Sequence, residues 1–254
     1  MQTHDDDGVL RLTFDRPDTR NALTTETAIE LADTIDAATP TAYDAIVITG
    51  AGDVFSAGGD LEAIAEFPES PRAAYEEVTE TFGRVVEAML ACPVPIVAKV
   101  NGDAIGAGLS IVALSDLAFA AADARFSCAF VKIGLLPDTG GTVMLPQIVG
   151  LRAAKRLAFT GEFFDADRAA ALELINEAVP ADDLDDLVAE TVEQLATGPT
   201  ATIGLMKQAI HENLGRSWKD GLEYETLLQG QARLSEAHRE GVSARLEGRE
   251  PEFE

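Results

Sequence analysis

Two glycine-rich segments, ITGAGDVFSAGGDL (48–61) and KVNGDAIGAGLSIVALSD (99–116), carry the strongest structural signal in the chain. Each follows the apolar pattern of a short buried strand and then leads into a helix. The small residues at 58–59 and 106–108 let another group approach the main chain closely. Main-chain N–H groups at a helix start can stabilise developing negative charge. The two segments therefore predict an α/β fold with a paired anion site.

Dinucleotide binding is the first alternative for these segments. Residues 50–52 begin like the dinucleotide-binding motif GxGxxG, but Phe55 occupies the position of the third glycine. In the second segment, Ile111 occupies that position. Neither segment is followed by the expected acid about twenty residues later. A nicotinamide or flavin enzyme is therefore disfavoured, while two ordinary tight turns stay open as an explanation.

Strand and helix signals alternate in the first half of the chain, whereas the second half is almost wholly helical. The predicted strands are Leu10–Phe14, Ala45–Thr49, Ile96–Val100 and Leu117–Ala121. The predicted helices are Thr24–Ala38, a helix from Ser70-Pro71 to just before Cys92, Gly106–Ser115, Arg152–Phe159, Ala166–Leu174, Leu184–Ala196, Pro199–Asn213 and a last stretch from about Lys219 to Leu246. We expect a loose tail after Gly248. The pattern indicates one α/β domain with a helical C-terminal appendage.

The composition is strongly acidic. Of 254 residues, 44 are Asp or Glu and 19 are Lys or Arg, which gives a formal net charge of −25. Such a surface repels phosphate backbones and anionic lipids, so nucleic acid and membranes are disfavoured as partners. Only five of the basic residues are lysine. Because the acidic residues are spread along the chain, we interpret the acidic composition as an adaptation to high salt rather than as a binding site for a cationic partner.

Cysteines and apolar runs point to a cytoplasmic protein. Cys92 and Cys128 are too few for a metal site or a disulfide framework, which fits a reducing compartment. Asp5 to Asp7 stand where a secretory signal would be basic and then apolar. The longest uncharged apolar run, 104–115, is too short to cross a bilayer.

Four motifs, in this order, carry a family resemblance: RPDTRNAL (16–23), FSAGGDL (55–61), NGDAIGAG (101–108) and IGLLPDTGGTVMLPQIVG (133–150). Together they resemble the crotonase, or enoyl-CoA hydratase/isomerase, family over roughly residues 8–250. The resemblance implies a spiral of ββα repeats forming a catalytic domain over 1–197 and a helical trimerisation region over 198–254. It also implies a homotrimer or a dimer of trimers, a coenzyme A thioester as substrate, and no metal or permanently bound cofactor.

The resemblance also assigns the substrate-binding groups. The oxyanion hole of the family is formed by two main-chain N–H groups, which fall at Gly59 and Ala107. The residues expected to touch substrate or coenzyme A are Ala22, Leu23, Ala57, Asp60, Leu61 and Phe130. Candidate partners for its phosphates are Arg20, Lys207 and Lys219, each of which can also be ordinary surface charge. Asn21 and Asp60 suit a turn and a helix cap, Cys128 suits an apolar wall, and Phe126 with Phe130 hints at a bulky acyl group.

The catalytic acids of family hydratases are missing. By motif alignment their two glutamates fall at Ser110 and Phe130, and neither residue can act alone as a base. Asp138 remains, following Leu135-Leu136-Pro137, and apolar surroundings would raise its basicity. The segments at 106–108, 129–130 and 134–141 resemble the ring-1,2-epoxyphenylacetyl-CoA isomerase subgroup. The resemblance therefore favours an enoyl-CoA isomerase with Asp138 as the acid/base.

Other roles for Asp138 stay open. It can cap a helix over 142–149, which would suit a non-catalytic scaffold that binds acyl-CoA. It can also serve a hydratase that lacks the usual glutamates. A dehalogenase-like nucleophile would need a histidine, and His4, His211 and His238 all lie away from the motifs.

Overall fold

The computed structural model describes residues 1–65 and 68–253, and in it the strands form two sheets. The larger sheet has the order β1 (Gln2–Asp6), β2 (Val9–Phe14), β3 (Ala45–Gly50), β5 (Ile96–Val100), β7 (Leu117–Ala121) and β10 (Glu177–Val179). The smaller sheet has the order β4 (Val54–Ser56), β6 (Asp103–Ile105), β8 (Arg125–Ser127) and β9 (Phe163–Asp165). Only the β1–β2 and β8–β9 pairs are antiparallel; every other neighbouring pair in these sheets is parallel.

The order of the strands along the chain explains why they form two sheets. A strand joins the larger sheet, the next strand joins the smaller sheet, and helical structure returns the chain for another turn, as in β3–β4, β5–β6 and β7–β8. The helices of this spiral are α1 (Thr25–Asp36), α2 (Leu61–Ile64), α3 (Pro71–Val78), α4 (Arg84–Ala91), α5 (Ala107–Leu114), α6 (Gly141–Ile148), α7 (Gly150–Thr160), α8 (Ala166–Ala171) and α9 (Leu184–Ala196). The repeat is the ββα spiral that the sequence predicted.

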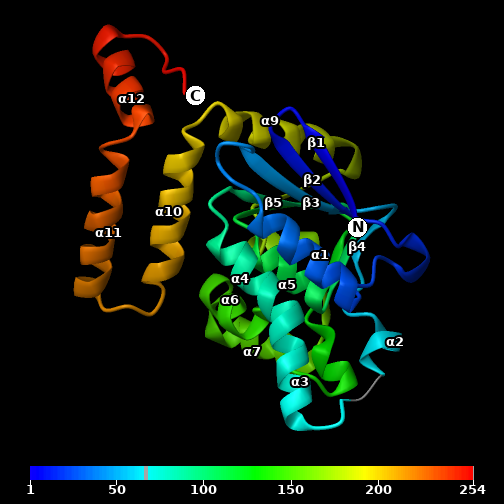
Figure 1. The fold of residues 1–254 in the computed structure, drawn as a ribbon. Coiled ribbons are helices and arrows are strands. Elements are labelled where there is room, and N and C mark those ends of the chain that lie inside the picture. The colour runs from blue at the N-terminus through cyan, green and yellow to red at the C-terminus, as the bar shows by residue number, and fades with distance from the viewer. Residues whose placement is uncertain (66–67, 254) are drawn as a thin grey trace.

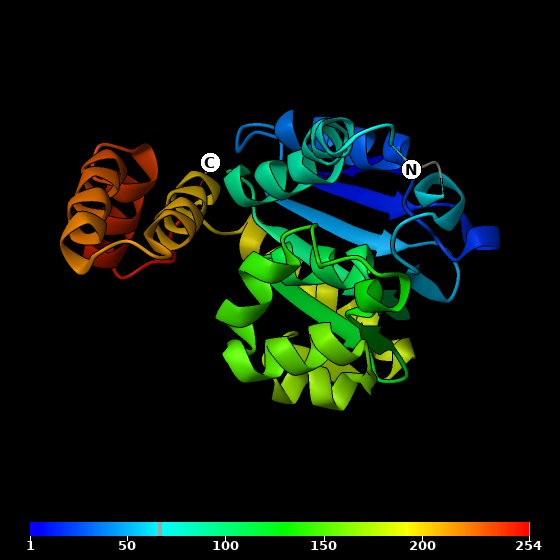
Figure 2. The ribbon, with the colours of Figure 1, turned by 90° about the horizontal axis from the view of Figure 1, so that it is seen from below.

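Figure 2 shows helices on both sides of the strands. The main core cluster joins residues of both sheets to residues of these helices, such as Leu31 of α1 and Met89 of α4. Its largest fully buried side chains include Phe14, Phe55 and Phe126. Helix α5 is buried along all of its length, so its sequence shows no polar face. Because α5 follows β6 directly, its first residues are held rigidly at the end of the smaller sheet.

Three further helices, α10 (Thr200–Asn213), α11 (Trp218–Ala232) and α12 (Glu236–Glu247), extend away from the sheets (Figure 1). They fall in the region 198–254 that the sequence assigned to the appendage. Lys207 of α10 is buried, and its ammonium lies 2.7 Å from the Asp116 carboxylate, which joins α10 to the core. In the described part of the chain, none of the helices is both long and apolar enough to cross a membrane.

The structure corrects several expected boundaries. The helix expected from 70 to 91 contains a π-helical turn at Thr79–Gly83, and the stretch from 219 to 246 is two helices. The tail after Gly248 is not loose over its described residues, because Arg249 pairs with Glu240 and Glu247 and the Glu252 N–H donates to Glu240. Strand β1 was not predicted, because all five of its residues are exposed and show no apolar alternation.

Candidate active site

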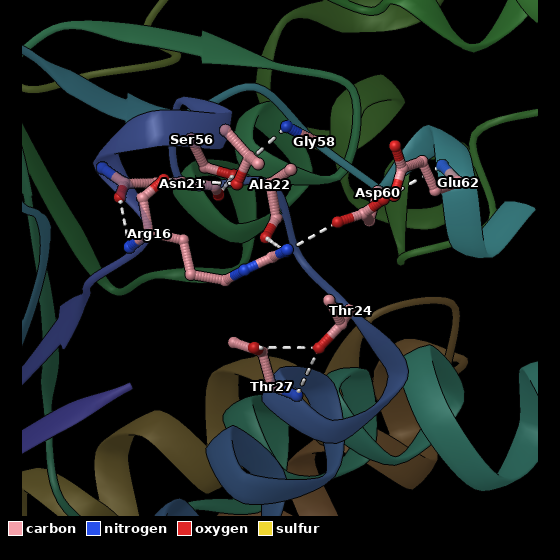
Figure 3. Close-up of polar contacts among 10 residues, drawn as sticks. Arg16, Asn21, Ala22, Thr24, Thr27, Ser56, Gly58, Asp60 and Glu62 are labelled. Carbon is pink, nitrogen blue, oxygen red and sulfur yellow. Dashed lines mark hydrogen bonds and ion pairs between the residues drawn. The ribbon is translucent and has the colours of Figure 1, made fainter.

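The first candidate oxyanion loop follows β4 and is fixed by the segment before α1. Ser56 Oγ donates to the Asn21 carbonyl and accepts the Gly58 N–H, at 2.9 and 3.1 Å (Figure 3). Asn21 is buried and left-handed, and its side-chain amide donates to the carbonyls of Ala51 and Val54. Asn21 is therefore a structural turn residue, as predicted.

Hydrogen bonds on both sides of Gly59 leave its own amide unpaired. Leu23 donates to the Gly58 carbonyl at 2.8 Å and accepts the Asp60 N–H at 2.9 Å. Among residues 1–65 and 68–253, no hydrogen-bond acceptor faces the Gly59 N–H. The loop therefore holds one main-chain donor in a fixed place and leaves it available to a ligand.

The second donor is the first amide of α5. The Gly106 N–H donates to the Ser127 carbonyl at 2.8 Å, and the Gly106 carbonyl accepts the Ser110 N–H. The Ala107 N–H between them has no partner in the described structure, as is usual for the first turn of a helix. The helix dipole adds partial positive charge at this amide.

The two loops leave neighbouring parallel strands and touch. Strands β4 and β6 are paired, and both loops follow their carboxyl ends. A Cβ atom on Gly58, whose φ is +92°, would lie 2.7 Å from the Ile105 carbonyl and 3.3 Å from the Ala107 nitrogen. Only glycine allows this approach. The Phe130 ring would lie 4.0 Å from a Cβ on Gly106, so it lies beside the same loop.

Asp138 lies in the turn before α6, and its side chain does not cap that helix. The N-cap of α6 is Gly140, with no side-chain cap, whereas Thr139 Oγ1 donates to Asp138 Oδ1 at 3.1 Å. Loss of solvation raises the pKa of Asp138, and hydrogen bonds from Thr139 and the main chain partly oppose this. Asp138 is exposed to water in the single chain, yet the protein atoms around its carboxyl group still disfavour the charged form.

Comparisons with known proteins decide the family. The family model for enoyl-CoA hydratase/isomerase matches residues 4–254. The chain belongs to the enoyl-CoA hydratase/isomerase family. It is 38% identical to a Rhodobacter capsulatus protein named "Probable enoyl-CoA hydratase", over 97% of this chain and 95% of that protein. It is 35% identical to the 1,2-epoxyphenylacetyl-CoA isomerase of Escherichia coli, over 99% and 97%. A crystal structure of enoyl-CoA hydratase from Mycobacterium smegmatis matches with a TM-score of 0.92 at 31% identity, covering 99% of this chain and 98% of that one.

These findings confirm the crotonase fold and membership of a family whose members act on coenzyme A thioesters. Both hydratase and isomerase names occur among the relatives. In the described residues there is no cluster of three or more histidine, cysteine or acidic side chains that could hold a metal ion.

Five of the six residues expected to touch substrate lie in or beside the first loop, whereas Phe130 lies beside the second loop. Ala22 and Ala57 are half-buried, Leu23 is buried, and Leu61 is exposed at the start of α2. Asp60 accepts the Glu62 N–H and therefore caps α2, as predicted, and it also pairs with Arg16 at 2.7 Å. Asp60 is therefore a structural group in this enoyl-CoA hydratase/isomerase family member.

Two of the three candidate phosphate partners are committed elsewhere. The Lys207 ammonium is buried and pairs with Asp116, so it is neither free for a phosphate nor ordinary surface charge. Arg20 pairs with Asp103 at 2.7 Å, and Lys219 lies over the Trp218 ring on α11. A hollow of about 620 Å³ beside the first loop offers no substitute, since its lining carries more acidic than basic side chains.

The structure also places the aromatic ring of Phe126 and the thiol of Cys128. Phe126 is fully buried and stacked on Phe164, so it belongs to the core rather than to a substrate-facing wall. Cys128 is buried and its pKa is raised to about 11 by desolvation, so its thiol is protonated and apolar in character.

Sequence reasoning missed two residues that hold the site together. Arg16 Nη1 donates to the Ala22 carbonyl at 2.9 Å and to Asp60, and so ties the segment before α1 to α2. Ser56 joins Asn21 to Gly58. Both residues lie inside the quoted motifs 16–23 and 55–61, but only the fold shows that these two motifs face each other.

Proposed function

We propose that this chain is an enoyl-CoA isomerase, which shifts a proton and with it a double bond in an acyl-CoA substrate. The observation that carries the proposal is that the Gly59 and Ala107 amides, on touching loops, both lack a partner among residues 1–65 and 68–253. A thioester carbonyl oxygen bound by two such donors can take the negative charge of an enolate. Removing one donor of this kind typically lowers the rate about 10²–10³-fold.

Asp138 is the proton-transfer group of the proposal. Its carboxylate takes a proton from the carbon next to the carbonyl, and the electron pair moves into the enolate held by the Gly59 and Ala107 amides. The same carboxyl then returns the proton at the far end of the allylic unit, which moves the double bond. Desolvation, which raises its pKa, makes the carboxylate a stronger base for this step.

A hydratase is the second candidate, because the Rhodobacter capsulatus relative carries that name. Against it stand Ser110 and Phe130 where family hydratases have glutamates. A non-catalytic scaffold is less well supported, since Asp138 does not cap α6.

The deciding experiment compares the wild type with Asp138→Asn on 3-enoyl-, 2-enoyl- and aryl-substituted CoA thioesters in heavy water. We expect wild-type deuterium exchange and double-bond migration, and a loss of about 10²–10⁴-fold in kcat in the variant. Equal hydration of 2-enoyl-CoA by both proteins would instead support a hydratase without this role for Asp138. Tight binding of the thioesters without turnover would support the scaffold.

We also propose that α10–α12, within residues 198–254, form the contacts of a homotrimer or a dimer of trimers in the cytoplasm. Large apolar side chains on these helices are exposed in the single chain, and an interface would bury them. These residues are Met206, Ile210, Trp218, Leu222 and Leu227, and Leu234 between α11 and α12 is exposed as well. Sedimentation of the wild type and of Leu222→Glu tests this: the wild type should run as a trimer or hexamer, and the variant as a smaller species. A monomeric wild type would contradict it.

A further inference from the structure

The hydroxyl of Ser110 is buried and has no hydrogen-bond partner in the described part of the chain. Ser110 lies one turn after Ala107 on α5, and the residue has no solvent-accessible surface. The other serine at the end of this helix, Ser115, donates its hydroxyl to the Ile111 carbonyl. Buried polar groups are nearly always paired, and an unpaired one costs stability. An unpaired hydroxyl one turn from a candidate oxyanion amide therefore calls for a functional explanation.

The Ser110 hydroxyl faces the turn that carries Asp138. A Cβ atom on Gly141 would lie 3.1 Å from Ser110 Oγ and 2.7 Å from the Pro137 Cβ. Glycine at 141 therefore lets the turn approach α5 more closely than any other residue would. Gly141 is the first residue of α6, and in the described structure its N–H has no main-chain acceptor. A free donor and a free hydroxyl thus lie on facing segments.

We propose that Ser110 is a positioning residue for Asp138: when a thioester is bound, its hydroxyl accepts the Gly141 N–H and fixes the Asp138 turn against α5. The carbonyl oxygen of the substrate binds the first amide of the same helix. The Ser110 contact would therefore set the distance between the proton-transfer group and the reacting carbon. Displacements of about 1 Å in such a geometry can cost 10²-fold in rate. This inference rests on the proposed function, because it requires Asp138 to react.

The test is Ser110→Ala, with Ser115→Ala, at the C-cap of the same helix, as the matched control. Ser110→Ala removes an unpaired buried hydroxyl, so we expect a melting temperature equal to or above that of the wild type. We expect kcat to fall about tenfold or more, with KM changed less than about twofold, because the effect is on positioning. Ser115→Ala removes a paired hydroxyl, so its melting temperature should fall while its kcat stays at the wild-type value.

Two outcomes would overturn the inference. One is wild-type kcat in Ser110→Ala. The other is a fall in melting temperature as large as that of Ser115→Ala, which would show a merely structural serine. Asp138→Asn, assayed beside them, separates this inference from the proposed function. An inactive Asp138→Asn with a fully active Ser110→Ala refutes only the role of Ser110. An active Asp138→Asn refutes the proposed function and the Ser110 inference together.

Discussion

At the residue scale, the carboxyl group of Asp138 connects reactivity to stability. Its pKa in the folded chain is raised above the ordinary 3.8, chiefly by desolvation. Below about that pH the group is neutral in both folded and unfolded chains. As the pH rises through the raised folded pKa, ionisation costs the folded state more than the unfolded one. The favourable contribution of the neutral carboxyl is therefore present in acid and lost towards neutral pH.

Asp138→Asn, which keeps the shape and removes the charge, should therefore melt higher than the wild type at pH 7. The difference should shrink as the pH falls and vanish near pH 3. Thermal unfolding followed by circular dichroism over this range measures it. Asp123→Asn, at an exposed position, is the control, and its melting temperature at pH 7 should stay close to that of the wild type. A destabilised Asp138→Asn at pH 7 would show that the carboxylate is held by favourable contacts instead.

Single residues also show how much of the candidate site could be predicted from the sequence. The family resemblance placed the two amides at 59 and 107, whereas from the glycine-rich strand-to-helix loops alone only a paired anion site was predictable. The burial of Lys207 was not, since its partner Asp116 lies far away in the chain and no local pattern marks the pair. The close approach of Gly141 to the Ser110 hydroxyl was missed for the same reason.

At the element scale, the short helix α2 depends on Asp60. This carboxylate caps α2 through the Glu62 N–H, and the Arg16 guanidinium, as its hydrogen-bond partner, is the main cause of a lowered pKa. A lowered folded pKa contributes stability above the ordinary value of 3.8, and that stability is lost as the pH falls through the folded pKa. Asp60 thus stabilises the loop that presents the Gly59 amide.

Asp60→Asn should keep the cap, since asparagine caps helices as well as aspartate does, but it removes the ion pair with Arg16. We expect a loss of roughly 1 kcal/mol in the free energy of unfolding at pH 7, measured by urea denaturation. The loss should disappear as the pH falls through the folded pKa, which lies below 3.8. Asp33→Asn, which removes an exposed pair with Arg84, is the control and should lower the free energy of unfolding by less than Asp60→Asn does. Equal losses in the two variants would contradict the structural role given to Asp60.

Elements with a regular apolar period were predicted best. Strand β7 and helix α9 begin and end at the expected residues. The break between α11 and α12 was missed, because residues 233–235 contain neither glycine nor proline and only Ser235 caps the new helix. Short strands such as β8 lie in the smaller sheet and have three residues, which is too few to show a period.

At the scale of the whole molecule, the main feature is the large negative net charge. The net charge of −25 means that most acidic side chains have no basic partner, so repulsion among carboxylates opposes folding. The ion pairs of the structure, such as Arg249 with Glu240, draw on only 19 basic side chains. Salt screens both the repulsion among carboxylates and the attraction within ion pairs, but the repulsion involves far more charges than the ion pairs do. The Debye length falls from about 8 Å at 0.15 M to about 3 Å at 1 M salt.

The melting temperature should therefore rise by several degrees between 0.1 and 2 M KCl at pH 7, as measured by calorimetry. The control uses the same protein near pH 4.3, the pI of the sequence, where the net charge is close to zero and the salt effect should be much smaller. Equal increases at both pH values would point to general exclusion of salt from the surface. A melting temperature that falls with KCl at pH 7 would mean that ion pairs outweigh the repulsion, and the acidic surface would then need a cationic partner rather than a saline solvent to explain it.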